Sequence, residues 1–199
     1  LSNFDTSQVK KIGYMFYDCS SLTSLDVSKF DTSQATNMEF IFTGCSSLTS
    51  LDVSNFDTSK AKYLRGMFSG CSSLTSLDVS SFNTSQATNM NSMFTRCSGL
   101  TKIVAPENTS SALWKLTNGK AWYYQPTGEV VKVISKAGIY TTEKPEVTIE
   151  AGTKFTKNKI EYSVVENTSK THTVTAYKGK NKEATSIKIP ATVEYDGIT

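Results

Sequence analysis

The sequence predicts a right-handed α/β solenoid of short parallel strands and short helices, followed by a small antiparallel β module. The solenoid is predicted because the ten letters CSSLTSLDVS occur at residues 19–28, 45–54 and 71–80, and because four cysteines lie 26 residues apart. Fixed periods of roughly 20–50 residues are typical of solenoids, propellers and arrays. Alternating apolar and polar residues after residue 146 predict the β module.

A short helix is expected in the first half of each unit. Ile12, Met15, Phe16 and Cys19 follow the i, i+3, i+4, i+7 spacing of an apolar helical stripe. In the second unit Gly44 stands where a C-terminal cap would lie. This pattern predicts one short amphipathic helix per 26-residue unit.

A short strand is expected in the second half of each unit. Leu25 and Val27 alternate with polar neighbours, as in a half-buried strand. The letters FDTS that follow suit a tight turn, since Asp, Ser and Thr side chains can bond nearby backbone groups. One coil cannot bury its own apolar side, but stacked coils bury a continuous column.

Equivalent apolar residues recur in every unit and are predicted to form a ladder sealed from water. The members of this structural ladder are Phe16, Cys19, Leu22, Leu25, Phe42, Cys45, Leu48, Leu51, Phe68, Cys71, Leu74, Leu77, Phe94, Cys97 and Leu100.

The full unit, LDVSNFDTSKAKYLRGMFSGCSSLTS at 51–76, resembles the 26-residue variety of the BspA-like leucine-rich-repeat bacterial surface proteins. The resemblance covers residues 1–104, where the DVSxFDTS, MF and CSSLTSL blocks recur in place. The closing ATSIKIPATVEYDGIT resembles the segment that leads into another kind of repeat in this family. The resemblance implies a leucine-rich-repeat-type solenoid in bacterial secreted or cell-surface proteins that are associated with adhesion and have no catalytic centre.

Three domains are expected. Residues 1–104 would form the solenoid, with about four 26-residue repeats, and residues 105–143 a C-terminal cap with an aromatic hairpin. Within the cap, SSALWKL at 110–116 can form one or two helical turns. Residues 144–199 would form a small all-β module or spacer. The first letters, LSNFDTS, match the interior of a later unit, so we expect the chain to be a fragment of a longer protein.

Composition argues against several functions. The net charge is +3, and residues 1–104 carry eight basic and eight acidic residues, so neither nucleic acid nor a charged groove is indicated. No apolar run approaches the ~18 residues of a membrane span. The chain has a single histidine, His172, far from the repeated serines. Without a phosphate-binding glycine loop or a marked carboxylate pair, we expect no enzyme activity, no catalytic residue and no cofactor.

Cysteines and aspartates are the candidates for metal or redox chemistry. The cysteine spacing is far from any CxxC pattern, and buried reduced thiols are favoured over a disulfide between adjacent coils. Asp26, Asp52 and Asp78 would form a carboxylate column, which could bind Ca²⁺ or be a solvated ladder. Calcium sites usually gather their ligands from one loop, so the solvated ladder is favoured and no metal is expected.

The favoured hypothesis is a secreted or cell-surface fragment, monomeric, that binds a host or bacterial surface protein or a matrix component. The strand face offers one interaction surface: Ser24, Asp26, Ser28, Ser50, Asp52, Ser54, Ser76, Asp78 and Ser80. Contact could also be made by irregular positions that vary between units: Tyr14, Tyr17, Tyr63 and Arg65. The near-identical units favour an alternative, a passive stalk that presents other domains. A further alternative is carbohydrate binding by Trp122, Tyr123 and Tyr124 of the hairpin.

Overall fold

The computed structural model describes residues 4–107, 114–125 and 128–145 in full, and the backbone of four strands beyond residue 153. The chain divides into two compact units, Leu1–Pro145 (unit 1) and Glu146–Thr199 (unit 2). The three-part division expected from the sequence stays a prediction.

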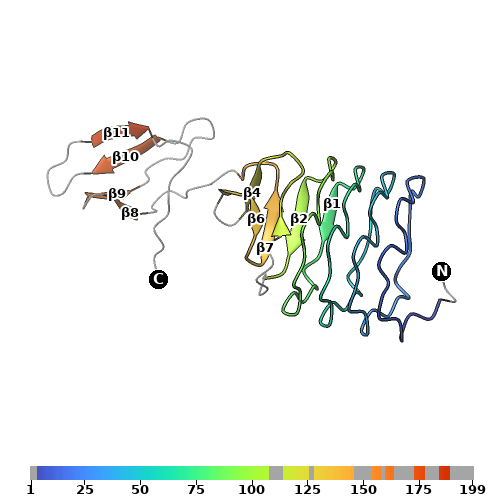
Figure 1. The fold of residues 1–199 in the computed structure, drawn as a ribbon. Coiled ribbons are helices and arrows are strands. Elements are labelled where there is room, and N and C mark those ends of the chain that lie inside the picture. Colours follow the sequence, from blue (N-terminus) through green and yellow to red (C-terminus); the bar gives the residue numbers. More distant parts are fainter. Residues whose placement is uncertain are drawn as a thin grey trace. The chain divides into compact units, whose positions relative to one another are not determined.

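Successive 26-residue segments of unit 1 lie over one another as stacked coils (Figure 1). Isolated parallel bridges join Lys11 to Asn37, Asn37 to Tyr63 and Tyr63 to Asn89. Farther along, β1 (Ser76–Asp78) pairs in parallel with β2 (Lys102–Ala105), in a register that places Leu77 opposite Ile103. Each paired position is therefore one repeat period away from its partner.

The predicted fold class is wrong, because no residue in the described ranges is helical and the strands form mixed sheets. The segment from Ile12 to Cys19 is a series of turns. Two residues within it, Tyr14 at φ 64° and Asp18 at φ 56°, have left-handed backbone conformations that an α-helix does not contain. The apolar stripe is thus produced by an irregular, repeating turn structure.

The hydrogen bonds of these turns explain why no helix forms. In a helix each N–H is bonded to a carbonyl four residues earlier. Here the N–H of Ile12 donates to the Asn37 carbonyl at 3.0 Å, and the N–H of Phe16 donates to the Ile41 carbonyl at 2.9 Å. Alternate backbone N–H groups of this segment donate to the next coil, and those of Tyr17 and Cys19 donate to the carbonyls three residues earlier, so no helical i to i−4 ladder forms.

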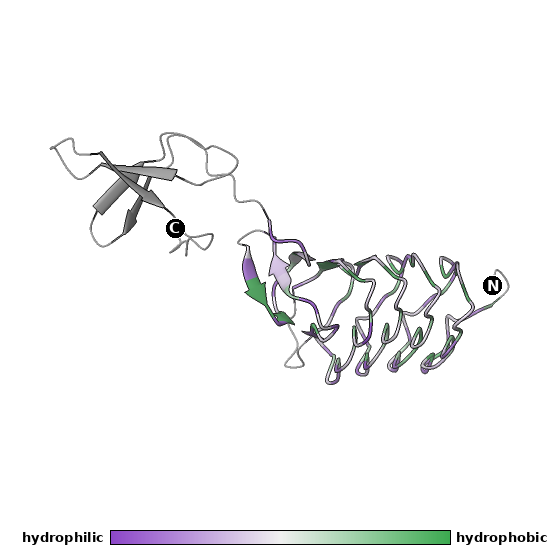
Figure 2. Ribbon diagram, turned by 90° about the horizontal axis from the view of Figure 1, so that it is seen from above, coloured by the Kyte–Doolittle hydropathy of each residue, from purple (hydrophilic) through white to green (hydrophobic). Residues whose placement is uncertain are grey.

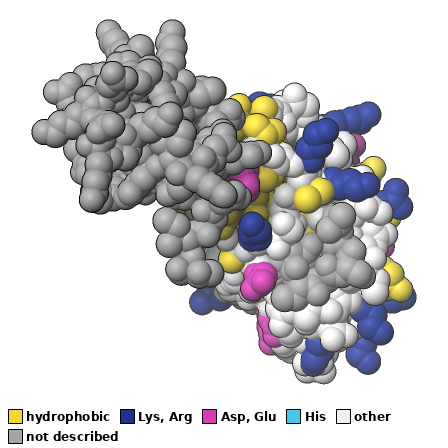
Figure 3. All heavy atoms as spheres, turned by 90° about the vertical axis from the view of Figure 1, so that its left-hand side faces the viewer, with side chains coloured by type: hydrophobic (Ala, Val, Ile, Leu, Met, Phe, Trp, Pro, Cys, Tyr) yellow, Lys and Arg dark blue, Asp and Glu magenta, His cyan; other side chains and the backbone are white. Residues whose placement is uncertain are grey.

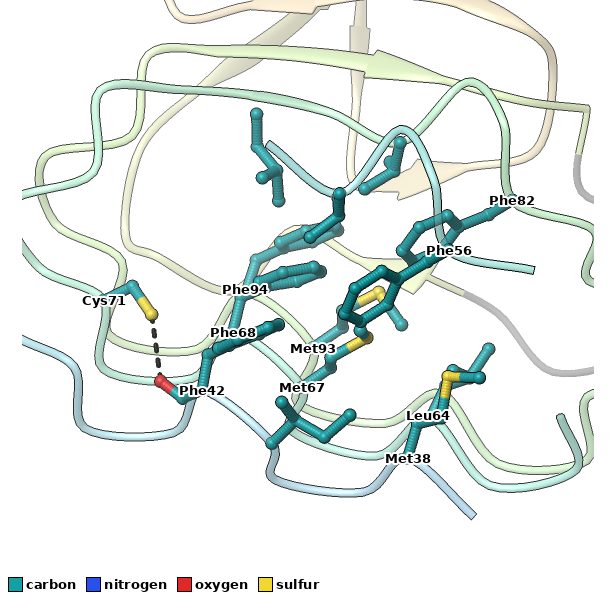
Figure 4. Close-up of a cluster of buried hydrophobic side chains, with 14 of the residues drawn as sticks. Met38, Phe42, Phe56, Leu64, Met67, Phe68, Cys71, Phe82, Met93 and Phe94 are labelled. Carbon is teal, nitrogen blue, oxygen red and sulfur yellow. Dashed lines mark hydrogen bonds between the residues drawn. The ribbon is translucent and has the colours of Figure 1, made fainter. Parts of the chain in front are cut away.

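Stacked phenylalanines form the centre of the core (Figure 4). The ring centroids of Phe16, Phe42, Phe68 and Phe94 are separated by 5.7, 5.8 and 6.2 Å, with interplanar angles of 3°, 12° and 4°. Offset aromatic stacking at such distances is favourable beyond the area it buries. Hydrophobic stretches recur at the same place in each coil (Figure 2). The letter-for-letter repetition therefore yields a column of like side chains.

The C-terminal end of the coils is covered by short antiparallel strands. These are β3 (Trp114–Lys115), β4 (Trp122–Tyr124), β5 (Glu129–Val131), β6 (Val133–Ile134) and β7 (Gly138–Thr141). β3 pairs with β6, and the larger sheet has the order β1-β2-β7-β4-β5.

Trp114 closes the phenylalanine column. Its buried ring lies 5.9 Å from the ring of Phe94 and 6.4 Å from that of Phe82, measured between centroids. The helical turns predicted for 110–116 are wrong at Trp114 and Lys115, which belong to β3. The strand places the indole over the end of the column, with its ring plane tilted by 47° to that of Phe94.

In the part of unit 2 that the structure describes, the strands form two antiparallel pairs. β8 (Lys154–Lys157) pairs with β9 (Ile160–Ser163), and β10 (Thr173–Tyr177) pairs with β11 (Ala184–Lys188). His172 lies outside the described residues.

Candidate interaction surface

The serines and aspartates of the predicted strand face are all exposed. The carboxylates of Asp26, Asp52 and Asp78 each accept a hydrogen bond at 2.9 Å from the backbone N–H two residues later. The side-chain and backbone hydrogen bonds of Ser28 lower the pKa of Asp26, and those of Ser54 do the same for Asp52. Each carboxylate therefore stabilises the turn of its own coil through this hydrogen bond.

Neither the aspartates nor the cysteines gather as metal ligands. In the described ranges no three His, Cys, Asp or Glu side chains are placed to hold one ion. In the same ranges no helix is long and apolar enough to cross a membrane.

Buried threonines link neighbouring coils, a role that sequence reasoning missed. Thr6, Thr32 and Thr58 are almost fully buried in the FDTS turns. The Thr58 hydroxyl donates to the Asn83 carbonyl at 2.9 Å and accepts the Asn83 N–H at 2.8 Å. Thr6 makes the same pair of bonds with Asp31. The sequence does carry a signal for this role, because Thr recurs at the same position of every FDTS block.

The four cysteine thiols are free, and three of them are buried. Each buried thiol donates to the carbonyl of a core phenylalanine, as Cys71 does to Phe42 at 3.1 Å (Figure 4). Burial raises the pKa of Cys45 to about 11 and that of Cys97 to about 12. Since the thiolate is the nucleophile, these groups are poorly suited to covalent chemistry.

An exposed aromatic cluster lies across three coils and consists of Tyr14, Tyr17, Phe40 and Arg65. The ring centroids of Tyr14 and Tyr17 are 5.5 Å apart, and those of Tyr14 and Phe40 are 5.0 Å apart. The Arg65 guanidinium carbon lies 5.4 Å from the Phe40 ring centroid, a cation–π contact. Tyr14 is 56% exposed and Tyr17 is 52% exposed. Three of the four predicted irregular positions thus belong to one surface cluster.

Phe40 completes this cluster and was not predicted from the sequence. Tyr63, the fourth predicted position, is 44% exposed and forms the coil-to-coil bridges with Asn37 and Asn89. Phe40 is half-buried and connects Tyr14 of the first coil with Arg65 of the third.

The backbone beneath the cluster is unfavourable for large side chains. Tyr14 and Phe40 have φ of 64° and 58°, and the equivalent residue of the third coil is Gly66 at 59°. Glycine adopts this conformation without steric cost, whereas other residues do so at a cost of about 1–2 kcal/mol. The Phe40 ring lies over Gly66, where an added Cβ would be 2.6 Å from two ring carbons. Gly66 therefore leaves space for the ring.

Basic side chains occur in the same turn segments. Lys10, Lys11, Lys62 and Arg65 are all exposed, whereas the strand face carries the aspartates. Lysine and arginine side chains also project around the C-terminal end of unit 1, with hydrophobic side chains visible between them (Figure 3). The same turn segments also contain the acidic residues Asp18 and Glu39, so this face carries charges of both signs.

The aromatic hairpin is largely a structural element. Trp122 is 1% exposed, and its Nε1–H donates to the Asn118 carbonyl oxygen Oδ1 at 2.8 Å. The Asn118 amide in turn donates to the Cys97 carbonyl at 3.3 Å. Tyr123 and Tyr124 are half-buried. The Trp122 indole therefore has no free face on which a sugar ring could stack.

Comparison with known proteins gives one result. No curated protein and no solved structure matches the chain. The family model described as "Mycoplasma protein of unknown function, DUF285" matches residues 1–108, which is more than half of the 199 residues. With its 26-residue repeats, the chain belongs to the DUF285 family.

Proposed function

We propose that the chain is a non-enzymatic binding fragment of a bacterial surface protein and that it contacts a partner protein through the aromatic cluster. The observation that carries this proposal is the placement of Tyr14 and Phe40, two large aromatic residues, at backbone positions that favour glycine. Unfavourable backbone conformations for a residue type are concentrated at functional sites. The turn itself does not require an aromatic residue, since the equivalent positions of the third and fourth coils are Gly66 and Ser92.

The composition of the cluster also supports protein binding. Tyrosine and arginine are enriched among the residues that dominate binding energy at protein interfaces. The cluster combines two exposed tyrosines with an arginine that packs on an aromatic ring.

The resemblance of residues 1–104 to the BspA-like surface proteins supports an extracellular setting and a host or matrix partner. The repeated polar side chains support a role without catalysis, because the serine–aspartate turns and the threonine bridges already use those groups within the fold. The near-identity of the coils supports a second candidate function, a passive stalk that presents other domains.

The test uses the full chain on an array of purified extracellular-matrix and cell-surface proteins. One variant carries Tyr14→Ser, Phe40→Ser and Arg65→Ser. The matched control carries Asp26→Asn, Asp52→Asn and Asp78→Asn, which keeps the oxygen that accepts each turn hydrogen bond. We expect the parent and the control to bind the same partner, and the cluster variant to lose roughly 30-fold in affinity or more, as for interface hot spots.

Two results would contradict the proposal. Loss of binding in the asparagine control alone would assign the contact to the strand face. If the parent chain bound no protein on the array, the second candidate function, a passive stalk, would be favoured. Slow labelling of Cys71 and Cys97 by a thiol reagent confirms that each variant is folded, since both thiols are buried.

A further inference from the structure

A turn in unit 1 gathers three backbone carbonyls around one point. The Nδ2 atom of Asn55 lies 3.1 Å from the carbonyl oxygen of Val27, 3.4 Å from that of Ser28 and 2.9 Å from that of Phe30. The two hydrogens of this amide group are therefore shared among three acceptors. Residues 27–30 thus form a carbonyl cradle, a set of converging carbonyl oxygens that holds one positively polarised group.

The same turn recurs at residues 53–56. In both turns the phenylalanine N–H donates to the valine carbonyl, at 2.9 Å for Phe30 and at 3.0 Å for Phe56. In both, the aspartate before the turn accepts the serine N–H at 2.9 Å. These matching hydrogen bonds indicate that the carbonyls of Val53, Ser54 and Phe56 form a second carbonyl cradle of the same shape.

The second cradle differs from the first in having no side-chain donor. Ser81 takes the place of Asn55 one repeat later, and in the part of the chain that the structure describes its hydroxyl makes no hydrogen bond. Among the same residues, no protein group donates to the carbonyls of Ser54 and Phe56. Since backbone carbonyls are strong acceptors that are rarely left unpaired, these oxygens must take their partner from solution.

The size of the cradle favours a large monovalent ion. The Asn55 nitrogen marks its centre, 2.9 to 3.4 Å from the surrounding oxygens. Calcium lies about 2.3–2.6 Å and magnesium about 2.0–2.1 Å from its oxygen ligands, so both are too small. An N–H donor fits the cradle directly, with hydrogen bonds of about 2.7–3.2 Å. Potassium fits as well, because backbone carbonyls can replace its hydration shell.

Two exposed carboxylates flank the second cradle. Asp52 comes directly before the turn and Asp57 directly after it. Hydrogen bonds from the serine two residues later lower the pKa of both, so both are ionised at neutral pH. The next cation along the chain, Lys60, donates to the Oε1 atom of Gln34 at 2.9 Å. The charged groups of this segment sum to a negative value, which favours a cation.

We infer that the carbonyls of Val53, Ser54 and Phe56 bind a monovalent cation of the size of ammonium, either K⁺ or the ammonium ion itself. The Ser81 hydroxyl can supply a further oxygen. In the first cradle the Asn55 amide does the work of this cation within the protein. The site is separate from the aromatic cluster and does not depend on the proposed partner.

The experiment measures the melting temperature of the full chain in chloride salts of K⁺, ammonium, Li⁺ and tetramethylammonium at equal ionic strength. Tryptophan fluorescence follows unit 1, which contains both tryptophans. One variant, Ser81→Asn, places an amide in the second cradle, as Asn55 does in the first. A second, Asn55→Ser, removes the amide from the first cradle. The matched control is Ser85→Asn, at an exposed serine outside both turns.

At a K⁺ or ammonium concentration several times the dissociation constant, we expect the melting temperature of the parent to rise by about 2–4 °C relative to tetramethylammonium. Ser81→Asn should abolish this rise, Asn55→Ser should enlarge it, and Ser85→Asn should leave it unchanged. A rise with ammonium alone would identify the ligand as a hydrogen-bond donor, whereas a rise with both ions would show that size and charge suffice.

Three results would overturn the inference. Equal melting temperatures of the parent in all four salts would mean that water alone meets these carbonyls. A K⁺ response that persists in Ser81→Asn would place the ion elsewhere. An equal response to Li⁺ would show a general effect of salt. Thallium NMR, in which Tl⁺ replaces K⁺, gives a second readout: the parent should broaden the Tl⁺ signal more than Ser81→Asn does.

Discussion

The phenylalanine column and the aromatic cluster both bring aromatic side chains of consecutive coils into contact, yet they differ in sequence, burial and backbone. The column uses the same residue in every coil, and Phe42, Phe68 and Phe94 are 0% exposed. The cluster uses a different residue in each coil, with Tyr14, Phe40, Gly66 and Ser92 at one equivalent position. In this protein the residues that are identical in every coil are buried structural positions, and the proposed partner contact lies at residues that vary between coils.

The largest expected difference between the two regions is in stability. Replacing Phe68 by alanine should cost about 3–5 kcal/mol, because it opens a cavity between two stacked rings. Replacing Phe40 by alanine should cost about 1 kcal/mol or less, since a half-buried surface ring loses few contacts. Urea unfolding followed by circular dichroism measures both. Equal costs would mean that the column is not the main source of stability.

The next largest effect is expected for the hydrogen bonds that the buried threonine hydroxyls make with the next coil. Thr58→Val keeps the shape of the side chain but leaves the Asn83 N–H and carbonyl without their partner. Loss of these buried hydrogen bonds should destabilise the fold by about 1–3 kcal/mol.

The control for this prediction is Thr75→Val, at an exposed threonine. Its effect should stay within about 0.5 kcal/mol, as for ordinary surface substitutions. If both variants were equally stable, the buried hydroxyls would not be what ties the coils together.

A smaller effect tests whether Gly66 serves the cluster. Gly66→Ala and Gly70→Ala both place alanine at positive φ, 59° and 75°, but only at Gly66 would the new Cβ meet an aromatic ring. We expect both to pay about 1 kcal/mol for the backbone conformation. Gly66→Ala should cost more by a coupling of about 0.5 kcal/mol or more, of the kind found for residues in contact.

A double-mutant cycle isolates that coupling. Combining Gly66→Ala with Phe40→Ala should remove the extra cost, because the ring that would be displaced is gone. Chemical denaturation of the two single variants and the double variant gives the coupling energy. Full additivity would show that Phe40 and Gly66 do not share space in solution.

The repeat and its column followed from the sequence because both depend on apolar periodicity. The same periodicity misled at Ile12 to Cys19, since the i, i+3, i+4, i+7 stripe is shared by a helix and by this turn structure. The glycines carry a further signal. The sequence predicts Gly44 as a helix cap, but Gly66 and Gly70 place two left-handed residues within one coil, which no helix accommodates.

The candidate site was predictable only in part, for a different reason. Tyr14, Tyr17 and Arg65 stood out as large side chains that break the repeat. Phe40 did not, because an apolar residue beside the stripe is indistinguishable from a core residue until the backbone fixes its direction. The fold of each coil, not the identity of the residue, places Phe40 between Tyr14 and Arg65.

The smallest stability effect is the sharpest test of the contrast. Tyr14→Gly relieves an unfavourable backbone conformation, worth about 1–2 kcal/mol, but glycine loses about 0.5–1 kcal/mol through the entropy of the unfolded chain and also forfeits the ring contacts. These terms nearly cancel, so the free energy of unfolding should stay within about 0.5 kcal/mol of the parent. Tyr17→Gly lacks the backbone gain and should be destabilising. Thermal and urea unfolding of the two variants, with binding measured beside them, separate the roles. If Tyr14→Gly preserves stability and loses the partner, the tyrosine is kept for recognition; if it destabilises as much as Tyr17→Gly, the residue serves the fold and the contrast between the two regions fails.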